Sequence, residues 1–582
     1  MTPRPSNYDK FPVIAVDSPP DSAWTGWQAT AQRIASELSR GATRIAIECY
    51  PGVSEDAILF ALESVLRPAF IARTALIWKD PAELNRLVAR DLTDDPVFGR
   101  MNGFTIDDFA DPCRLAGCRA EVKQRGDSPI VAIGTGTALL LPEPQVLIYA
   151  DLPRWEIQKR QRSGQIGNLA AENHQASASA KYKRAYFLDW RVADRIKRQH
   201  LGRLDYLLDT TDSSSPILIT GDLFRAALRH AVSRPFRVVP FFDPGPWGGQ
   251  WMRDVCGLDS KAPNYAWCFD CVPEENSLLF DFGGVRAEVP ALDLVFRHPR
   301  ELLGDAVHGR FGAEFPIRFD LLDTMQGGNL SLQVHPLTEY IQDKFGMAYT
   351  QDESYYLLDA APDASVYLGL RAGIDHCQMA RELAQAQAGD FPFDAERFVN
   401  RWPARKHDHF LIPAGTIHCS GANSVVLEIS ATPYIYTFKL WDWGRLGLDN
   451  RPRPIHLQHG LANIQWDRDT DWVRASLINK IQVLTHNDHS TEERTGLHAR
   501  EFIETRRHWF SAPVSHNTQG GVHVLNLVEG HSAIIESPEN RFAPFEVHYA
   551  ETFIVPAAVG CYSVRPTSQG ARCATIRASV RT

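Results

Sequence analysis

The sequence predicts a multidomain protein in which an N-terminal α/β part precedes a mainly β part. Three observations support this. The 582 residues exceed one domain at roughly 150 residues each. Helical and strand patterns alternate up to about residue 235, and short strands and turns dominate beyond a stretch rich in proline and glycine at residues 233–252. We expect domains at residues 1–235, 236–460 and 461–582, with a helical insertion near 374–403.

The N-terminal part shows the pattern of a three-layer sheet protein. Residues 27–39 have apolar positions at helical spacing, residues 43–49 form a β-branched run that ends in a turn, and Ser54 is placed to cap a following helix. This strand, turn and helix unit predicts a parallel sheet covered by helices. Further strands are expected at TALIW (74–78), 128–141, 145–152 and 215–220.

Composition limits the function. A net charge of -9 offers no basic field for nucleic acid, so small molecules are the expected partners. The sequence shows no secretory signal pattern and no apolar run of about 18 residues, which predicts neither export nor membrane insertion. Ten cysteines in this length fit a reducing, cytoplasmic compartment, and the pair Cys268 and Cys271 lacks the second pair of a zinc site, so we expect a structural role for it.

The first strand, turn and helix are typical of a phosphate-binding loop, but the loop ECYPGVSED has no lysine to reach a phosphate. With the later strand and the helix that carries Arg154, Arg160 and Arg162, this part resembles the P-loop nucleoside and sugar kinases in a degenerate form. In the alternative, Arg160 and Arg162 lie on a solvated helix face. A scaffold role, regulation by a phosphorylated ligand and dimerisation remain open for this domain, and the oligomeric state is not determined.

The informative stretch of the β part is LSLQVH. Leu330, Leu332 and Val334 alternate with polar residues, so Ser331, Gln333 and His335 share one face of a strand. Glu353 follows at the start of another strand, and His418 opens a strand after a turn at residues 413–415. Two histidines, a carboxylate and an amide oxygen inside a β-barrel could bind one divalent ion, although each alone is more often a structural residue.

The motifs LSLQVHP, PAGTIH and LEIS, in this order, resemble the type I mannose-6-phosphate isomerases, a cupin family. The resemblance begins near residue 236, covers the rest of the chain, and ends in a part that resembles the family's metal-free second β-sandwich. It implies a cupin fold and metal ligands at Gln333, His335, Glu353 and His418. It implies zinc, and these ligands would also accept iron, manganese or cobalt.

The resemblance also implies an isomerisation of mannose 6-phosphate and fructose 6-phosphate through a cis-enediolate. Glu428 matches an acidic residue proposed as acid or base in the family, and Lys439 falls where the family has an arginine. A structural carboxylate is the alternative role for Glu428.

Three cationic positions of the family differ here. Asp320 and Gln351 stand where the family has lysines, and Lys439 replaces the arginine, which weakens the expectation of a 6-phosphate. Arg318, Lys439 and Ser331 offer partial compensation, so we expect Ser331, Arg318 and Gln351 to contact the substrate. The alternatives are an isomerase of a non-phosphorylated or different sugar, and a non-catalytic protein that senses or binds a sugar.

Overall fold

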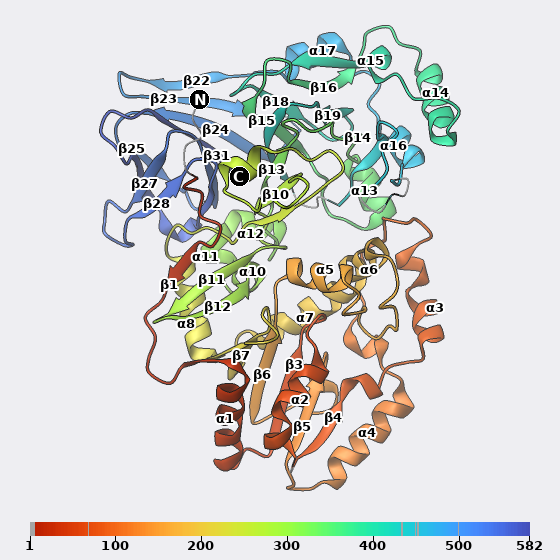
Figure 1. Ribbon diagram of the computed structural model, residues 1–582, viewed down its shortest axis with the longest axis vertical. Coiled ribbons are helices and arrows are strands. Elements are labelled where there is room, and N and C mark those ends of the chain that lie inside the picture. The colour runs from red at the N-terminus through yellow and green to blue at the C-terminus, as the bar shows by residue number, and fades with distance from the viewer. Residues whose placement is uncertain are drawn as a thin grey trace. The chain divides into compact units, whose positions relative to one another are not determined.

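The protein is described from a computed structural model (Figure 1), which covers residues 6–67, 69–431, 435–447, 450, 453–496, 498 and 500–581. It forms two compact units. The N-terminal unit consists of Val13–Ala231 and Glu274–His298, and the β unit consists of the chain up to Pro12, Val232–Pro273 and the chain from Pro299 onward. The segment 274–298 therefore packs with the N-terminal unit, although it follows the predicted boundary at residue 235 by about 40 residues of sequence.

The described part of the N-terminal unit contains a seven-stranded sheet in the order β2-β8-β7-β6-β3-β5-β4. The five strands from β7 to β4 are parallel neighbours, as the sequence predicts, whereas β8 is antiparallel to β7 and β2 is antiparallel to β8. The strands are β2 (Ala23–Thr25), β3 (Arg44–Cys49), β4 (Phe70–Arg73), β5 (Ile130–Gly134), β6 (Val146–Asp151), β7 (Tyr206–Asp209) and β8 (Ile217–Thr220).

Helices flank this sheet, and the expected helices after residues 26 and 54 are confirmed. The Ser54 side chain accepts a hydrogen bond from the Ala57 amide at 3.3 Å, so it caps α2 as predicted. Apolar side chains of α1 and α2 pack on the strands in one buried cluster. The helices are α1 (Gly26–Ser39), α2 (Glu55–Leu66), α3 (Pro81–Leu92), α4 (Pro112–Gln124), α5 (Arg154–Arg162), α6 (Ala178–Arg184), α7 (Trp190–His200), α8 (Gly221–Val232) and α10 (Ala291–Arg297). A small sheet of β1 (Val13–Ala15), β11 (Ser277–Phe282) and β12 (Val285–Pro290) completes the unit.

Two expectations for this unit are wrong in detail. The strand expected at TALIW lies earlier in the sequence, at Phe70–Arg73. Residues Thr74–Leu76 instead form a short 3-10 helix. Arg160 does not lie on a solvated face, because its guanidinium donates to the Gly52 carbonyl and, at 2.6 Å, to the Thr210 carbonyl. Arg160 is buried and closes the turn that follows β3, while Arg162 is exposed.

The β unit is built from antiparallel sheets. The six-stranded site sheet has the order β18-β15-β20-β13-β10-β9, and the five-stranded site sheet has the order β17-β16-β19-β14-β21. Side chains of the two sheets meet, because Glu353 of β15 contacts His418 of β19. The strands are β9 (Phe241–Asp243), β10 (Trp267–Cys271), β13 (Ile317–Asp323), β14 (Leu332–Val334), β15 (Glu353–Ala360), β16 (Ser365–Leu370), β17 (Val399–Pro403), β18 (His409–Ile412), β19 (His418–Ser420), β20 (Ser424–Ala431) and β21 (Phe438–Trp441).

A second pair of antiparallel sheets follows in the same unit, with strand orders β22-β23-β24-β31-β26-β29 and β25-β30-β27-β28. Apolar side chains between them form one buried cluster. The strands are β22 (Gln482–His486), β23 (Ser490–Gly496), β24 (Ile503–Phe510), β25 (Val514–Asn517), β26 (His523–Glu529), β27 (Ser532–Glu536), β28 (Phe545–His548), β29 (Thr552–Val555), β30 (Cys561–Pro566) and β31 (Cys573–Val580).

The expected helical insertion is present but shorter than predicted. It comprises α14 and α15, and residues 399–403 belong to strand β17. The helices of the β unit are α9 (Trp251–Val255), α11 (Pro299–Leu303), α12 (Asp305–Phe311), α13 (Thr338–Phe345), α14 (His376–Ala388), α15 (Ala395–Phe398), α16 (Leu457–Asn463) and α17 (Thr470–Ser476). Across the described ranges, no helix has the length and apolar character needed to cross a bilayer.

The pair Cys268 and Cys271 lies on β10, where a bulge separates the two residues. Both thiols are free and buried, and burial raises the pKa of each well above its usual value. They therefore pack as small apolar side chains in the core of the β unit.

Candidate metal centre

Three side chains converge on one point between the two site sheets. The Glu353 carboxylate places Oε1 2.8 Å from His418 Nε2 and Oε2 3.0 Å from His335 Nε2. Possible ligand atoms of the three residues all lie within 4.8 Å of one another, and their side chains are completely buried. Two imidazoles and a carboxylate in this spacing form a set that can hold a divalent metal ion.

Backbone carbonyls orient both histidines. His335 Nδ1 lies 3.2 Å from the Tyr436 carbonyl oxygen, and His418 Nδ1 lies 2.8 Å from the Thr416 carbonyl oxygen. A carbonyl only accepts, so each Nδ1 carries a proton, and each Nε2 faces Glu353, where it can bind a metal ion in place of a second proton. Among the described residues, His335 Nε2 and Glu353 Oε1 have no hydrogen-bond donor, and a cation between them would satisfy both atoms.

Gln333, the fourth ligand that the resemblance implies, lies beside this set. It stands opposite His418 in the antiparallel ladder of β14 and β19, and its amide nitrogen lies 3.2 Å from His418 Nε2. The oxygen and nitrogen of a glutamine side-chain amide are assigned from their hydrogen bonds. Rotation of the Gln333 amide by 180° would turn its oxygen toward His418. All four ligands inferred from the resemblance therefore lie together in the structure.

A chain of polar contacts joins this centre to Glu428. Gln351 donates its amide to Glu353 Oε2 at 2.8 Å and to Glu428 Oε1 at 3.4 Å. Arg318 donates to the same Glu428 oxygen, and its Nε lies 3.1 Å from Asp320 Oδ1. The chain Glu353, Gln351, Glu428, Arg318 and Asp320 is buried throughout.

Burial and charge move the pKa values of these carboxyls in opposite directions. Burial raises the pKa of Glu428 well above its usual value, and the nearby Asp320 and Glu353 raise it further, while Arg318 lowers it. Burial raises the pKa of Asp320 to about 6 against the effect of Arg318. At Glu353 the two imidazoles outweigh burial and lower the pKa well below its usual value. Glu428 is therefore the carboxyl of this group best suited to hold a proton near neutral pH.

Asp320 explains why Arg318 does not act as a free cation. The two residues lie on one face of β13, and Asp320 stands opposite Glu428 on β20. The Arg318 guanidinium thus pairs with the Asp320 carboxylate and donates to Glu428, so little of its charge remains for a bound anion.

A cationic cluster lies on the other side of the centre, around Asp442. Its carboxylate accepts from Ser331 at 2.9 Å, from Arg445 at 2.6 Å and from Arg453 at 2.7 Å. Lys439 stands opposite Gln333 in the ladder, and burial together with Arg453 lowers the pKa of its amine to about 8. Sequence reasoning found Ser331 and Lys439 but missed Arg445 and Arg453. Both arginines lie in short sequences, LWDWGR at residues 440–445 and RPRPIHL at residues 451–457, that also resemble the isomerase family and could have indicated them.

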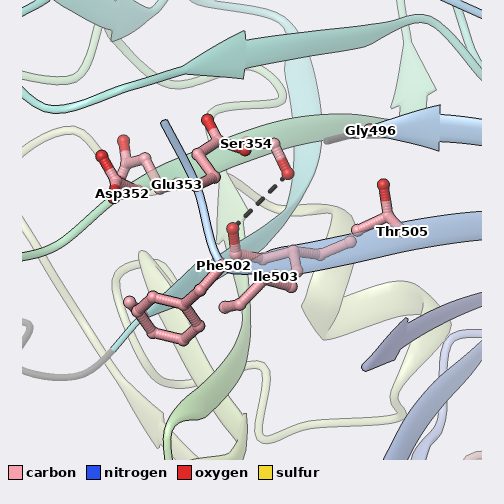
Figure 2. A pocket seen from close by; sticks show the side chains of 10 residues that line it. Asp352, Glu353, Ser354, Gly496, Phe502, Ile503 and Thr505 are labelled. Atoms are coloured by element: carbon pink, nitrogen blue, oxygen red, sulfur yellow. Dashed lines mark hydrogen bonds between the residues drawn. The ribbon is translucent and has the colours of Figure 1, made fainter. Parts of the chain in front are cut away.

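A small cavity lies behind Glu353. Figure 2 shows Asp352, Glu353 and Ser354 on its wall, with Ile503 and Thr505 from strand β24 and Phe502 directly before that strand. Its volume is about 10 Å³, which is room for one water molecule and not for a sugar. Glu501 also lines it, and burial raises the pKa of that carboxyl well above its usual value.

Fold and site together define a mixed α/β protein whose antiparallel sheets enclose a candidate site of two histidines, a carboxylate and an amide. Comparison with known proteins identifies sequences that are similar to parts of this chain. Residues 26–233 match a domain of unknown function, DUF8485. A mannose-6-phosphate isomerase of Streptococcus mutans is 28% identical over 218 residues, which cover 37% of this chain and 63% of the relative. Mannose-6-phosphate isomerase ManA of Bacillus subtilis is 25% identical over 237 residues, which cover 40% of this chain and 69% of the relative.

Among solved structures, the mannose 6-phosphate isomerase from Bacillus subtilis aligns with a TM-score of 0.48 at 18% identity, covering 59% of this chain and 99% of that one. The curated relatives confirm the resemblance to the mannose-6-phosphate isomerase family, whose members are enzymes. This chain spans about two thirds of the length of those curated relatives. The likeness of the N-terminal unit to P-loop kinases stays a prediction.

Proposed function

We propose that the β unit is a metal-dependent aldose–ketose isomerase that interconverts mannose 6-phosphate and fructose 6-phosphate. The observation that supports this most strongly is the convergence of His335, His418 and Glu353. The amide of Gln351 connects this group to a second acidic side chain, Glu428. In this proposal Gln333, His335, Glu353 and His418 hold one divalent ion in a cupin fold. Their nitrogen and oxygen atoms suit zinc, and also iron, manganese or cobalt.

Isomerisation moves a proton between C2 and C1 of the sugar through a cis-enediolate. The bound ion would supply the positive charge that stabilises the oxyanion of that species. Glu428 is the proposed acid or base, because its pKa is raised and only its Oε1 has a partner among the described contacts. That leaves Oε2 for the substrate. Gln351 holds Glu428 at a fixed distance from the metal centre.

The cluster around Asp442 is the proposed place for an anionic part of the substrate. Lys439, Arg445 and Arg453 carry three positive charges against the single charge of Asp442, and Ser331 joins the cluster by its hydroxyl. A phosphate dianion is normally held by several such donors. Ser331 is thus proposed as a substrate-binding residue, and Lys439, which was expected among the catalytic residues, is proposed to act by contacting this anionic group.

One observation favours a second candidate, an isomerase of a non-phosphorylated or different sugar. The sequence predicts that Arg318 contacts the substrate, yet Arg318 is already paired with Asp320 and hydrogen-bonded to Glu428. The site therefore has one cationic side and one side with no free charge.

A sugar panel tests the proposal. The full chain is loaded with zinc, its metal content is measured on the same preparation, and turnover is followed with mannose 6-phosphate, mannose and other free and phosphorylated hexoses. The proposal expects interconversion of mannose 6-phosphate and fructose 6-phosphate. Turnover of free sugars alone would establish the second candidate, and no turnover of any sugar by the metal-loaded chain would refute both.

For the rest of the chain we propose the domains 236–460 and 461–582 as the catalytic domain and a metal-free second β domain. Residues 1–235 are proposed as a kinase-like domain without phosphoryl transfer. Each of the ten cysteines is free, which supports a reducing, cytoplasmic location. We expect no nucleic-acid partner, because the net charge is -9.

A further inference from the structure

The N-terminal unit contains a cavity of about 640 Å³. It opens at the carboxyl ends of β3, β4 and β5, and its wall includes the loop at residues 49–57 and the segment at residues 165–172. In open α/β sheets, ligands bind outside the carboxyl ends of the strands. The volume also lies in the range of small-molecule sites. The position and the size of the cavity therefore both match a binding site.

One buried hydroxyl of the cavity wall has no hydrogen-bond partner among the described residues. Thr74 is fully buried and lines the cavity, and its Oγ1 has no hydrogen-bond partner among the described residues. Such a group costs about 1–3 kcal/mol when it stays unpaired, so proteins normally supply a partner. A ligand in the cavity could be that partner.

Glu55 lies beside this hydroxyl, and a glycine leaves room for both groups. A Cβ atom at Gly134 would lie 2.0 Å from Thr74 Oγ1 and 2.9 Å from Glu55 Oε1, and the φ of Gly134 is +121°. Only glycine therefore fits at the end of β5. Burial raises the pKa of the Glu55 carboxyl, although Arg73 opposes this effect. A carboxyl in this setting accepts hydrogen bonds from uncharged hydroxyl groups.

The charges of the wall argue against a phosphate. The first turn of α2, where an anion would otherwise bind, already carries Glu55 and Asp56. Arg73 pairs with Asp56 at 2.8 Å and with Glu55 at 3.5 Å. A phosphate placed at this helix end would face two carboxylates.

The other cations of the wall are also engaged. Arg160 donates to backbone carbonyls and to Glu156, and Arg114 pairs with Asp80. Lys79 donates to the Asp108 carbonyl at 2.7 Å. Each of these cations on the described wall is thus engaged by a carboxylate or a carbonyl of the protein.

An aromatic side chain completes the set, because Trp78 also lines the cavity. An indole can pack against the apolar C–H face of a sugar ring while polar groups bind its hydroxyls. We propose that this cavity binds a neutral, hydroxyl-rich small molecule, such as a free hexose, with Thr74 and Glu55 as its main hydrogen-bonding groups. The proposal does not depend on the isomerase activity of the β unit.

Binding to the full chain tests it. The His335→Ala variant is used to weaken the candidate metal centre, so that a sugar bound elsewhere can be detected. Mannose, glucose and fructose at millimolar concentration are measured by ligand-observed NMR and calorimetry, with mannose 6-phosphate, inorganic phosphate and ATP as charged probes. At least one free hexose should bind, and it should bind more tightly than its 6-phosphate.

Variants assign the binding to the cavity. Glu55→Gln and Thr74→Val, each added to His335→Ala, should weaken hexose binding about tenfold or more. Thr74→Val keeps the volume and removes an unpaired hydroxyl, so it should fold at least as well as the parent. Glu63→Gln, on the same helix but on an exposed side chain paired with Arg67, is the matched control and should leave binding unchanged. Absence of hexose binding, tighter binding of the charged probes, or equal binding by Thr74→Val would each overturn the proposal.

Discussion

Gln351 donates its amide to Glu353 at 2.8 Å and reaches Glu428 Oε1 at 3.4 Å, so one uncharged side chain links the candidate metal centre to the candidate proton-transfer residue. Both carboxylates and the amide are buried. A neutral amide at this position avoids adding a charge between two carboxylates that already affect each other's pKa.

Removal of one histidine should remove the metal. His418→Ala deletes an imidazole that faces Glu353, and we expect metal affinity to fall by more than the 10- to 100-fold typical of outer-shell partners. Metal content is measured by mass spectrometry after dialysis, together with turnover. The exposed His489→Ala is the control. Full metal retention by His418→Ala would contradict the assignment of this centre.

Gln351→Met should lower kcat by about 10-fold or more while leaving metal content unchanged. The variant keeps the volume of the side chain and removes two hydrogen bonds to charged groups, each of which contributes about 1.5–3 kcal/mol. Steady-state kinetics and metal analysis on one preparation distinguish a positioning role from a ligand role. Gln385→Met on the exposed face of α14 should behave as the parent. An unchanged kcat would mean that Gln351 is not needed to position Glu428.

Lys439→Met should lower activity toward phosphorylated sugars more than activity toward free sugars. Its loss removes one of three positive charges around Asp442, so kcat/KM for mannose 6-phosphate should fall by about 100-fold, with a much smaller change for any free sugar that turns over. Lys439→Arg should restore part of the activity, because the charge is retained. Equal losses for both kinds of sugar would show that Lys439 does not contact the phosphate.

Arg318→Met should destabilise the protein by about 3–5 kcal/mol, because it leaves Asp320 and Glu428 buried without their cation. Chemical unfolding gives the free energy of unfolding. The exposed pair of Arg300 and Asp305 provides the control, and Arg300→Met should cost no more than about 1 kcal/mol. The double variant Arg318→Met with Asp320→Asn should recover part of the loss. A cost for Arg318→Met as small as that of Arg300→Met would contradict a structural role.

His409 should make the β unit sensitive to acid. Burial, with a contribution from Arg507, lowers the pKa of His409 to about 3, whereas the unfolded chain has a pKa of about 6.5. The folded state therefore binds fewer protons between these values, so this contribution to stability is present above pH about 6.5. It is lost as the pH falls toward 3, by about 1.4 kcal/mol per pH unit.

Unfolding curves between pH 7 and pH 4 check this sign. His409→Asn removes the titrating group, so its stability should depend less on pH than that of the parent across this range. The exposed His489→Asn should leave the slope unchanged. Equal slopes for the parent and His409→Asn would show that His409 does not titrate in this way.

The sequence by itself determined the local elements of this protein and the identity of its candidate ligands. Alternation of apolar and polar residues predicts a strand over residues 331–335, and the structure confirms it for Leu332–Val334, whereas Ser331 and His335 flank that strand. The Ser54 helix cap is confirmed, because this signal depends on neighbours within a few residues. The resemblance then grouped Gln333, His335, Glu353 and His418, which the structure brings together.

Only the tertiary structure determined which charged side chains pair with one another and which are buried. The pairing of Arg318 with Asp320 and Glu428, the burial of Arg160, and the meeting of Arg445 and Arg453 at Asp442 all join side chains whose contacts depend on how strands and loops pack. The strand expected at TALIW lies at Phe70–Arg73, and Thr74, which begins the turn after it, lines the cavity. Ion pairs, burial and cavities depend on distances through space, and no periodicity along the chain encodes them.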